Sequence, residues 1–348
     1  MKITNRFALL VSSLLILSAC SREAVTPPAA TAAETIINGA GSSFDNPAFT
    51  KWFAVYGAAN PGVHFNYQSV GSGAGQQQLL KQTVDFGASD APMSDDNLAK
   101  APGKILHIPV VAGGVAIIYN LPGDPKVKLD GDALANIYMG NIKNWNDPKL
   151  AALNPGVTLP DLAIMVVHRS DGSGTSFIFT DYLSSVNEAW GGTVGKGTSV
   201  KWPIGIGMGA KGSEGVSGQV KQVPGAIGYA ELAYANQNKI PYADMKNSTG
   251  NFISPTPDSV SAALATAKIP EDFRFSMVNA PGEKAYPISG ASWILVYQKQ
   301  KDTKTQKILT DFLKWAITEG QKISPTLDYA PLPDNVQKRE LELIDTIK

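Results

Sequence analysis

Three segments of this chain share the same order of a strand, a loop of glycine and small hydroxyl residues, and a helix. The loops are Gly39–Phe44, Gly71–Gly75 and His168–Ser176. Alternating or apolar runs at Val63–Tyr67 and Ala163–Val167 predict strands before the second and third loops. Because short apolar runs alternate with amphipathic stretches along most of the chain, we predict an α/β fold with mixed sheets flanked by helices.

Apolar side chains recur at helical spacing after each loop. The first predicted helix contains Phe49, Trp52, Phe53 and Tyr56, the second spans Gln76–Val84, and the third contains Ile178, Tyr182 and Val186. A further amphipathic helix is predicted at Thr303–Glu319, with its apolar side packed on the first lobe defined below.

Loops placed in this way suit an anion. The N–H groups of a first helical turn have no partner inside the helix and carry the positive end of its dipole. Arg169 adds a guanidinium and Ser173 and Thr175 add hydroxyl donors in the third loop. N-capping of the local helices is the alternative role for hydroxyls such as Ser43 and Ser72.

The length of the chain, 348 residues, exceeds the usual size of a single core and predicts two lobes with a cleft between them. Two long apolar segments, 108–119 and 293–297, are predicted to be the strands that pass between the lobes. The first lobe is then expected to contain residues 36–115 plus 290–348, and the second lobe residues 116–289.

The N-terminus has the form of a bacterial lipoprotein signal. A short basic start precedes the apolar run Phe7–Leu17, which is too short to span a bilayer, and the segment Leu17–Cys20 resembles a lipoprotein cleavage site. We therefore expect residues 1–19 to be a signal peptide, and residues 20–35 to comprise a lipidated Cys20 and a flexible tether. An ordinary secretory signal with an incidental cysteine is the alternative.

Composition argues against several other functions. The chain has 30 Lys and Arg and 30 Asp and Glu residues, so no net field recruits nucleic acid. His64, His107 and His168 are scattered without a metal-binding pattern, so we expect no metal and no cofactor. The stretch Gly207–Gly212 matches GxGxxG, but a lone match is weak evidence for a dinucleotide site.

Four motifs together resemble the phosphate-binding protein family of the bacterial high-affinity ABC phosphate importer. They are GAGSSF at Gly39–Phe44, YQSVGSGAG at Tyr67–Gly75, VDFGASDAPMSD at Val84–Asp95 and HRSDGSGTSF at His168–Phe177. The resemblance extends over most of the chain. It implies a two-lobed, class II periplasmic-binding-protein-like fold with the ligand cleft between the lobes.

The resemblance also implies the residues that contact phosphate. They are Ser43, Phe44, Ser72, Asp90, Arg169, Ser173, Gly174 and Thr175. Asp171 is expected to pair with Arg169 and not with the ligand. An ionised Asp90 accepts hydrogen bonds but cannot donate them, so it would suit an anion that still carries a proton, such as phosphate, and would reject sulfate.

The function implied is a non-enzymatic one: capture of inorganic phosphate by hinge closure and delivery to the permease subunits of an ABC importer. The expected location is the cell envelope outside the cytoplasmic membrane, with the N-terminal lipid in the membrane. A phosphatase is an alternative, because Ser173, His168 and Asp171 are the residue types of a hydrolytic triad. A binder of arsenate or sulfate, or a phosphate or arsenate sensor without a transporter, is another.

Overall fold

A computed structural model describes residues 34–203 and 205–348 of the chain. The predicted signal peptide, Cys20 and nearly all of the predicted tether lie outside the described residues. Residues 34–348 form a compact unit.

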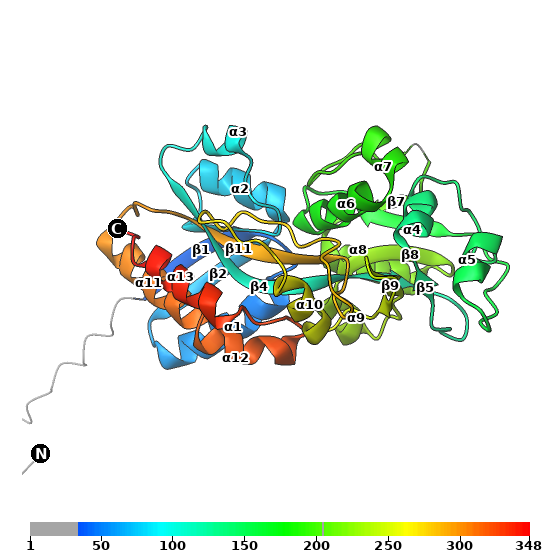
Figure 1. The fold of residues 1–348 in the computed structure, drawn as a ribbon. Coiled ribbons are helices and arrows are strands. Elements are labelled where there is room, and N and C mark those ends of the chain that lie inside the picture. Colours follow the sequence, from blue (N-terminus) through cyan, green and yellow to red (C-terminus); the bar gives the residue numbers. More distant parts are fainter. Residues whose placement is uncertain (1–33, 204) are drawn as a thin grey trace, which may run out of the picture. The chain divides into compact units, whose positions relative to one another are not determined.

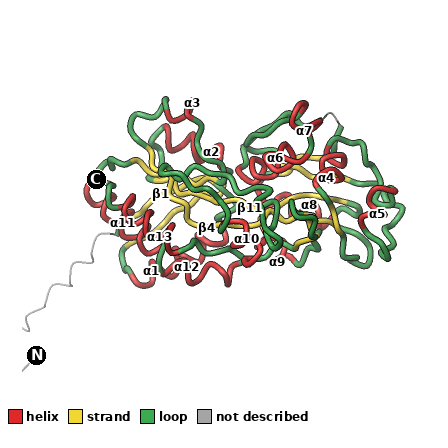
Figure 2. The backbone as a smooth tube through the Cα atoms, viewed as in Figure 1, coloured by secondary structure: helices red, strands yellow, loops and turns green. Residues whose placement is uncertain are grey.

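An eight-stranded mixed sheet runs through this unit, in the order β2-β1-β3-β11-β4-β8-β6-β7. Figure 2 shows these strands between layers of helices, as the sequence predicts. The neighbouring strands around β1 and around β6 are parallel, whereas β4 and β11 run antiparallel to their neighbours. The strands are β1 (Thr35–Gly41), β2 (Val63–Ser69), β3 (Phe86–Ser89), β4 (Ile105–Tyr119), β6 (Met165–Arg169), β7 (Met208–Ala210), β8 (Ala226–Glu231) and β11 (Ser289–Tyr297).

A second sheet has three short strands in the order β10-β9-β5. These strands are β5 (Lys128–Leu129), β9 (Asp244–Lys246) and β10 (Phe252–Ile253).

The long strand β4 belongs to both halves of the large sheet. Its residues up to Gly114 pair with β11, and its residues from Val115 to Tyr119 pair with β8. Every residue of β4 and of β11 is buried, which explains the apolar segments 108–119 and 293–297 that lie within these two strands. The two predicted long strands are thus present and lie side by side (Figure 1).

Helices cover both faces of the large sheet. Figure 1 shows α2 on one side of β1 and β2, with α1, α11 and α12 on the other. The helices are α1 (Asn46–Ala59), α2 (Ser72–Leu80), α3 (Asp95–Leu98), α4 (Gly131–Tyr138), α5 (Pro148–Leu153), α6 (Gly174–Val186), α7 (Glu188–Thr193), α8 (Gly212–Gln222), α9 (Leu232–Asn238), α10 (Pro257–Leu264), α11 (Thr303–Ala316), α12 (Glu319–Ile323) and α13 (Asp334–Ile344), with a 3₁₀ turn η1 at Ser324–Leu327.

The amphipathic helix α11 packs on α1 through aromatic side chains. Phe312 lies 5.5 Å from Phe53, 5.3 Å from Tyr56 and 4.5 Å from Phe65 of β2, measured between ring centroids. Aromatic pairs at such separations add to the stability that burial alone provides. The predicted packing of this C-terminal helix on the N-terminal part of the chain is confirmed.

Several predicted boundaries are wrong, including the starts of β4 and β11, which lie at Ile105 and Ser289 and not at residues 108 and 293. The helix expected at Gln76–Val84 is α2, which begins at Ser72 because Gly71, with φ of 90°, turns the chain directly into the first helical turn. The helix expected at Thr303–Glu319 ends at Ala316, and α12 follows as a separate element. The strand expected at Ala163–Val167 begins and ends two residues later, as β6.

Within the described residues, no helix is both long enough and apolar enough to cross a membrane.

Candidate anion-binding site

The second and third glycine loops, which follow β2 and β6, are in direct contact. The N–H of Gly73 donates to the carbonyl of Gly172 at 2.8 Å, and the N–H of Gly174 donates to Oγ of Ser72 at 3.0 Å. The second loop is also tied to the first, because the N–H of Gly71 donates to the carbonyl of Gly41 at 2.7 Å. Strand-to-helix loops that are distant in the sequence are therefore assembled into one cluster.

Glycine is required at two of these contacts. A Cβ atom on Gly71 would lie 2.3 Å from Oδ2 of Asp171, and φ of 90° at this residue already disfavours a side chain. A Cβ atom on Gly174 would lie 2.6 Å from Oγ of Ser72 and 2.6 Å from the carboxyl carbon of Asp90. Any side chain at either position would separate the loops.

All eight residues that are expected to contact phosphate are buried. None of the seven that have side chains is more than 3% exposed, and Gly174 is also buried. Buried polar groups are costly unless they are hydrogen-bonded, so the partners of each group decide what the cluster can bind.

Arg169, at the end of β6, supplies the positive charge of the cluster. Its Nε donates to Oδ1 of Asp171 at 2.8 Å and its Nη2 donates to Oδ2 at 2.6 Å, which is a bidentate pair. Its Nη1 donates to Oγ1 of Thr175 at 3.4 Å. Burial acts to raise the pKa of Asp171, but the hydrogen bonds and charge of Arg169 outweigh it and hold this pKa below its usual value. Asp171 therefore stays ionised and fixes the guanidinium in place.

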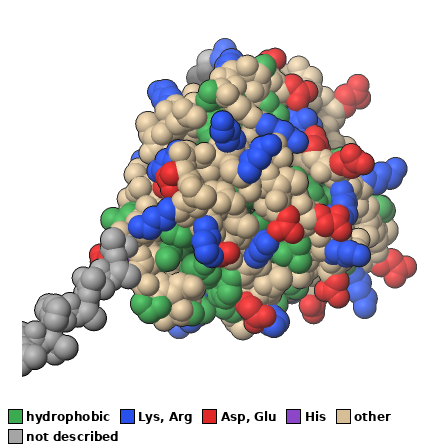
Figure 3. All heavy atoms as spheres, turned by 90° about the vertical axis from the view of Figure 1, so that its left-hand side faces the viewer, with side chains coloured by type: hydrophobic (Ala, Val, Ile, Leu, Met, Phe, Trp, Pro, Cys, Tyr) green, Lys and Arg blue, Asp and Glu red, His purple; other side chains and the backbone are tan. Residues whose placement is uncertain are grey.

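The positive charge is local. On the face shown in Figure 3, basic and acidic side chains are intermingled, and the chain as a whole has no net charge. An anion would therefore be attracted by Arg169 and by the helix N-termini at the cluster, not by a general field.

Asp90, directly after β3, is the acceptor of the cluster. Its Oδ2 accepts from Oγ1 of Thr175 at 3.1 Å, and its Oδ1 lies 3.3 Å from Oγ of Ser72 and 3.4 Å from Oγ of Ser292. Burial raises the pKa of Asp90, while hydrogen bonds from Ser42, Thr175 and Ser72 and the charge of Arg169 oppose this rise.

Only one of the three hydroxyls Ser43, Ser72 and Ser173 caps the helix that follows it. Oγ of Ser173 accepts from the N–H of Ser176, so Ser173 is the N-cap of α6. Capping of the local helix is the wrong interpretation for Ser43 and Ser72, because Asp45 and Gly71 stand at the N-cap positions of α1 and α2.

Ser43 and Ser72 instead bind the first turns of other helices. Oγ of Ser43 accepts from the N–H of Ser213 in α8 at 3.1 Å, and Oγ of Ser72 accepts from Gly174 in α6. The N–H of Phe44 donates to Oγ of Ser42 at 2.9 Å.

Four further polar residues of this cluster were not predicted from the sequence: Ser42, Asp45, Ser213 and Ser292. Ser213 had a usable signal, because β7 lies within the stretch Gly207–Gly212 and α8 begins at Gly212, so this part of the chain is a fourth strand, loop and helix. The N–H of Gly212 donates to Oδ1 of Asp171 at 3.1 Å, so this loop belongs to the same cluster. Ser292 lies inside the buried strand β11, where a single serine carries no local signal.

The three residues of the possible hydrolytic triad, His168, Ser173 and Asp171, each interact with other groups and not with one another. The ring of His168 stacks on Trp202 with 4.7 Å between centroids, and its Nδ1 lies 3.1 Å from the carbonyl oxygen of Arg169. Ser173 caps α6 and Asp171 binds Arg169. A triad needs its histidine between the hydroxyl and the carboxylate, and these three side chains are not arranged in that way. Across residues 34–203 and 205–348, no group of three or more His, Cys, Asp or Glu side chains is placed to hold a metal ion.

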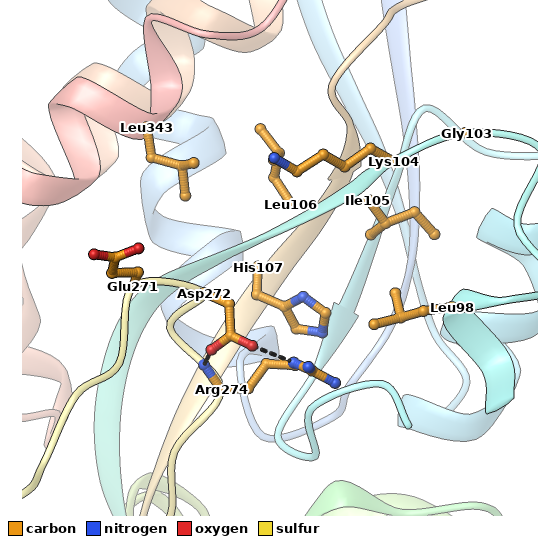
Figure 4. A pocket seen from close by; sticks show the side chains of 10 residues that line it. All are labelled: Leu98, Gly103, Lys104, Ile105, Leu106, His107, Glu271, Asp272, Arg274 and Leu343. Atoms are coloured by element: carbon orange, nitrogen blue, oxygen red, sulfur yellow. Dashed lines mark hydrogen bonds and ion pairs between the residues drawn. The ribbon is translucent and has the colours of Figure 1, made fainter. Parts of the chain in front are cut away.

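A separate cavity of 460 Å³ lies beside the start of β4 (Figure 4). His107 faces it, and its Nε2 accepts from the N–H of Met93 at 3.0 Å. Burial and the neighbouring Arg274 lower the pKa of His107 to about 4, so this histidine is neutral. Arg274 forms salt bridges through Nη1 to Oδ1 of Asp95 at 2.6 Å and through Nε to Oδ2 of Asp272 at 2.8 Å. None of the predicted phosphate contacts lines this cavity.

The fold and the buried site together define a periplasmic-type binding protein, and the family comparison gives the same class. A family model described as a PBP superfamily domain matches residues 26–319. Two similar solved structures are under 25% identical and show the fold alone. One is a periplasmic phosphate-binding protein (PfluDING) bound with phosphate, with a TM-score of 0.73, 23% identity and coverage of 87% of this chain and 92% of that one. The other is a phosphate-binding protein from Stenotrophomonas maltophilia, with a TM-score of 0.67, 22% identity and coverage of 89% and 94%.

Two relatives are similar over most of their length. The phosphate-binding protein PstS of Pasteurella multocida is 44% identical over 310 residues, which cover 88% of each chain. The protein of the same name from Haemophilus influenzae is 45% identical over 304 residues, which cover 86% of this chain and 90% of that one. The chain therefore belongs to the family of the phosphate-binding proteins PstS.

Proposed function

We propose that this protein captures inorganic phosphate outside the cytoplasmic membrane and delivers it to the membrane subunits of an ABC importer, without catalysing a reaction. Family membership supports the ligand and the transport role. The observation that carries the proposal is the buried cluster of Arg169 and Asp90, in which one cation, one carboxylate acceptor and several hydroxyl and helix N–H donors lie within hydrogen-bonding reach of one another.

Each predicted contact then has a role. The hydroxyls of Ser43, Ser72, Ser173 and Thr175 and the N–H groups of Phe44 and Gly174 donate to phosphate oxygens. Arg169 donates to two oxygens and supplies the charge, while Asp171 holds it in place. Asp90 accepts the proton that phosphate still carries. To receive phosphate, the hydroxyls exchange their present hydrogen bonds to one another for bonds to the ligand.

Binding is proposed to close two lobes, residues 36–115 plus 290–348 and residues 116–289, about β4 and β11. The change of partner strand at Gly114 and Val115 of β4 supports this division. The contacts of Ser43 with Ser213 and of Ser72 with Gly174 also support it, because each joins one proposed lobe to the other.

Calorimetry tests the function. The segment from Glu34 to Lys348, freed of bound ligand, is titrated with phosphate, arsenate and sulfate in parallel, and one-to-one phosphate binding with no heat from sulfate is expected. A folded sample that binds no phosphate would contradict the proposal. Equal binding of sulfate would favour a general oxyanion binder, and release of phosphate from a phosphate monoester would favour the phosphatase.

We also propose that Cys20 carries a lipid that anchors the protein after removal of residues 1–19. Its support is the sequence of the N-terminal segment, since this part lies outside the described residues. Fractionation of cells that express the full chain is expected to place the protein in the membrane fraction and a Cys20→Ser variant outside it. Equal membrane association of both variants would contradict the anchor.

A further inference from the structure

Asp45 is a second carboxylate at the cluster, and the proposed function gives it no role. It follows Phe44 directly and stands at the N-cap position of α1, but its side chain does not cap that helix. The residue is fully buried. Its Oδ2 lies 2.7 Å from Oγ of Ser292, and its Oδ1 has no hydrogen-bond partner among the described residues.

Ser292 links Asp45 to Asp90. Its Oγ lies 2.7 Å from Oδ2 of Asp45 and 3.4 Å from Oδ1 of Asp90. A hydroxyl has one proton and can donate to only one of two carboxylates. If both carboxylates were ionised, one of them would face a lone pair of Ser292 without a proton between them. A proton on Asp45 removes this conflict, because Asp45 then donates to Ser292 and Ser292 donates to Asp90.

The surroundings of Asp45 favour its neutral form. The ionisable groups that interact with it are Asp90 after β3, Glu231 at the end of β8, Tyr67 on β2 and Tyr329 after η1. Each of these is an acid, so none supplies a positive charge. Burial raises the pKa of Asp45 well above its usual value, Asp90 raises it further, and the hydrogen bond with Ser292 opposes this rise only in part.

Arg169 does not provide a compensating positive charge for Asp45. It is bound by both oxygens of Asp171, and its remaining charge acts on Asp90. When two carboxylates interact this closely, the first proton taken up belongs to the pair, and the geometry decides where it resides. Asp90 accepts from hydroxyls on both of its oxygens, whereas Asp45 has one unpartnered oxygen, so the proton belongs on Asp45.

We propose that Asp45 is a positioning residue of this site: it holds a proton, and through Ser292 it keeps Asp90 as the one ionised acceptor of the pair. This inference rests on the proposed function for its effect on phosphate. With Asp45 neutral, the pair carries one negative charge toward the ligand. With Asp45 ionised, a second negative charge would repel phosphate, and Ser292 could no longer serve both carboxylates.

Infrared spectroscopy tests the proton directly. The carbonyl stretch of a protonated carboxylic acid is separate from the bands of carboxylates. The difference spectrum of the wild type minus Asp45→Asn is expected to contain this acid band at neutral pH, and the band should shift in Ser292→Ala, which loses the hydrogen bond. The matched control is Asp96→Asn at an exposed carboxylate of α3, which should not change the acid region. Absence of an acid band from Asp45 in a folded sample would overturn the proposal.

Phosphate titrations of the same samples test the effect on binding. Asparagine cannot ionise, so the ratio of the wild-type to the Asp45→Asn dissociation constant is expected to stay constant while the acid band persists. It should rise by at least about ten-fold at the pH where the band disappears. A ratio that changes at a different pH, or that stays constant after the band has gone, would also overturn the proposal. The infrared result needs no ligand, so a wild type that shows the band but binds no phosphate would mean that the proposed function has failed while Asp45 still holds its proton.

Discussion

Replacement of Arg169 by methionine is expected to lower the affinity for phosphate by at least about 10³-fold, which corresponds to about 4 kcal/mol. Removal of one partner of a buried charge interaction costs about 2–5 kcal/mol or more, because the other charge stays buried without compensation. In this protein the loss affects the ligand, Asp171 and Asp90 together. The variant should also be less stable by up to about 3 kcal/mol, the lower end for a buried pair, since Asp171 is left as an unpaired charge in a partly buried position.

Calorimetry and chemical unfolding measure these two effects separately. The double variant Arg169→Met with Asp171→Asn removes both charges, so it should regain much of the stability but none of the binding. Arg274→Met is the matched control, because Arg274 is also paired with carboxylates but lies outside the cluster. It should keep the affinity of the parent. Binding by Arg169→Met within ten-fold of the parent would show that this guanidinium is not the main contact of the anion.

Replacement of Asp90 by asparagine is expected to remove most of the discrimination between phosphate and sulfate. A site that requires a hydrogen bond from its ligand rejects an analogue without it by about 10⁴- to 10⁵-fold, because a buried acceptor is left unpaired. Asp90 is that acceptor, and it is almost fully buried. An asparagine amide can donate to an unprotonated oxygen, so sulfate should gain affinity while phosphate loses some.

Titration of both anions into the parent and into Asp90→Asn measures the ratio of the two affinities. Asp181→Asn is the matched control, since Asp181 is a buried carboxylate whose charge is already matched by Lys196 at 2.7 Å. This control should keep the ratio of the parent. If Asp90→Asn keeps it too, selection by the proton of the ligand is wrong for this protein.

Much of the fold follows from local patterns. The apolar runs at β4 and β11, the alternation at β2 and the aromatic spacing of α1 each predict an element that is present. These patterns suffice because strands and helices of this kind are determined by which side chains must be buried at a period of two or 3.6 residues. The end of α2 could not be placed in this way, because Lys81 and Gln82 continue the polar face and nothing local marks the last turn.

By itself the sequence determined which groups the site could use: three loops of glycine and hydroxyl residues before helices, Arg169 with Asp171 nearby, and, through the resemblance to the family, the carboxylate of Asp90. Only the tertiary structure decided which of these groups meet. Ser43 binds the first turn of α8, and Ser292 lies between Asp45 and Asp90, although it is 247 residues from Asp45 in the chain. Such contacts depend on the packing of whole strands and helices, whereas local patterns depend only on neighbouring residues. For that reason the two carboxylates at this site could be recognised as a pair only from the folded protein.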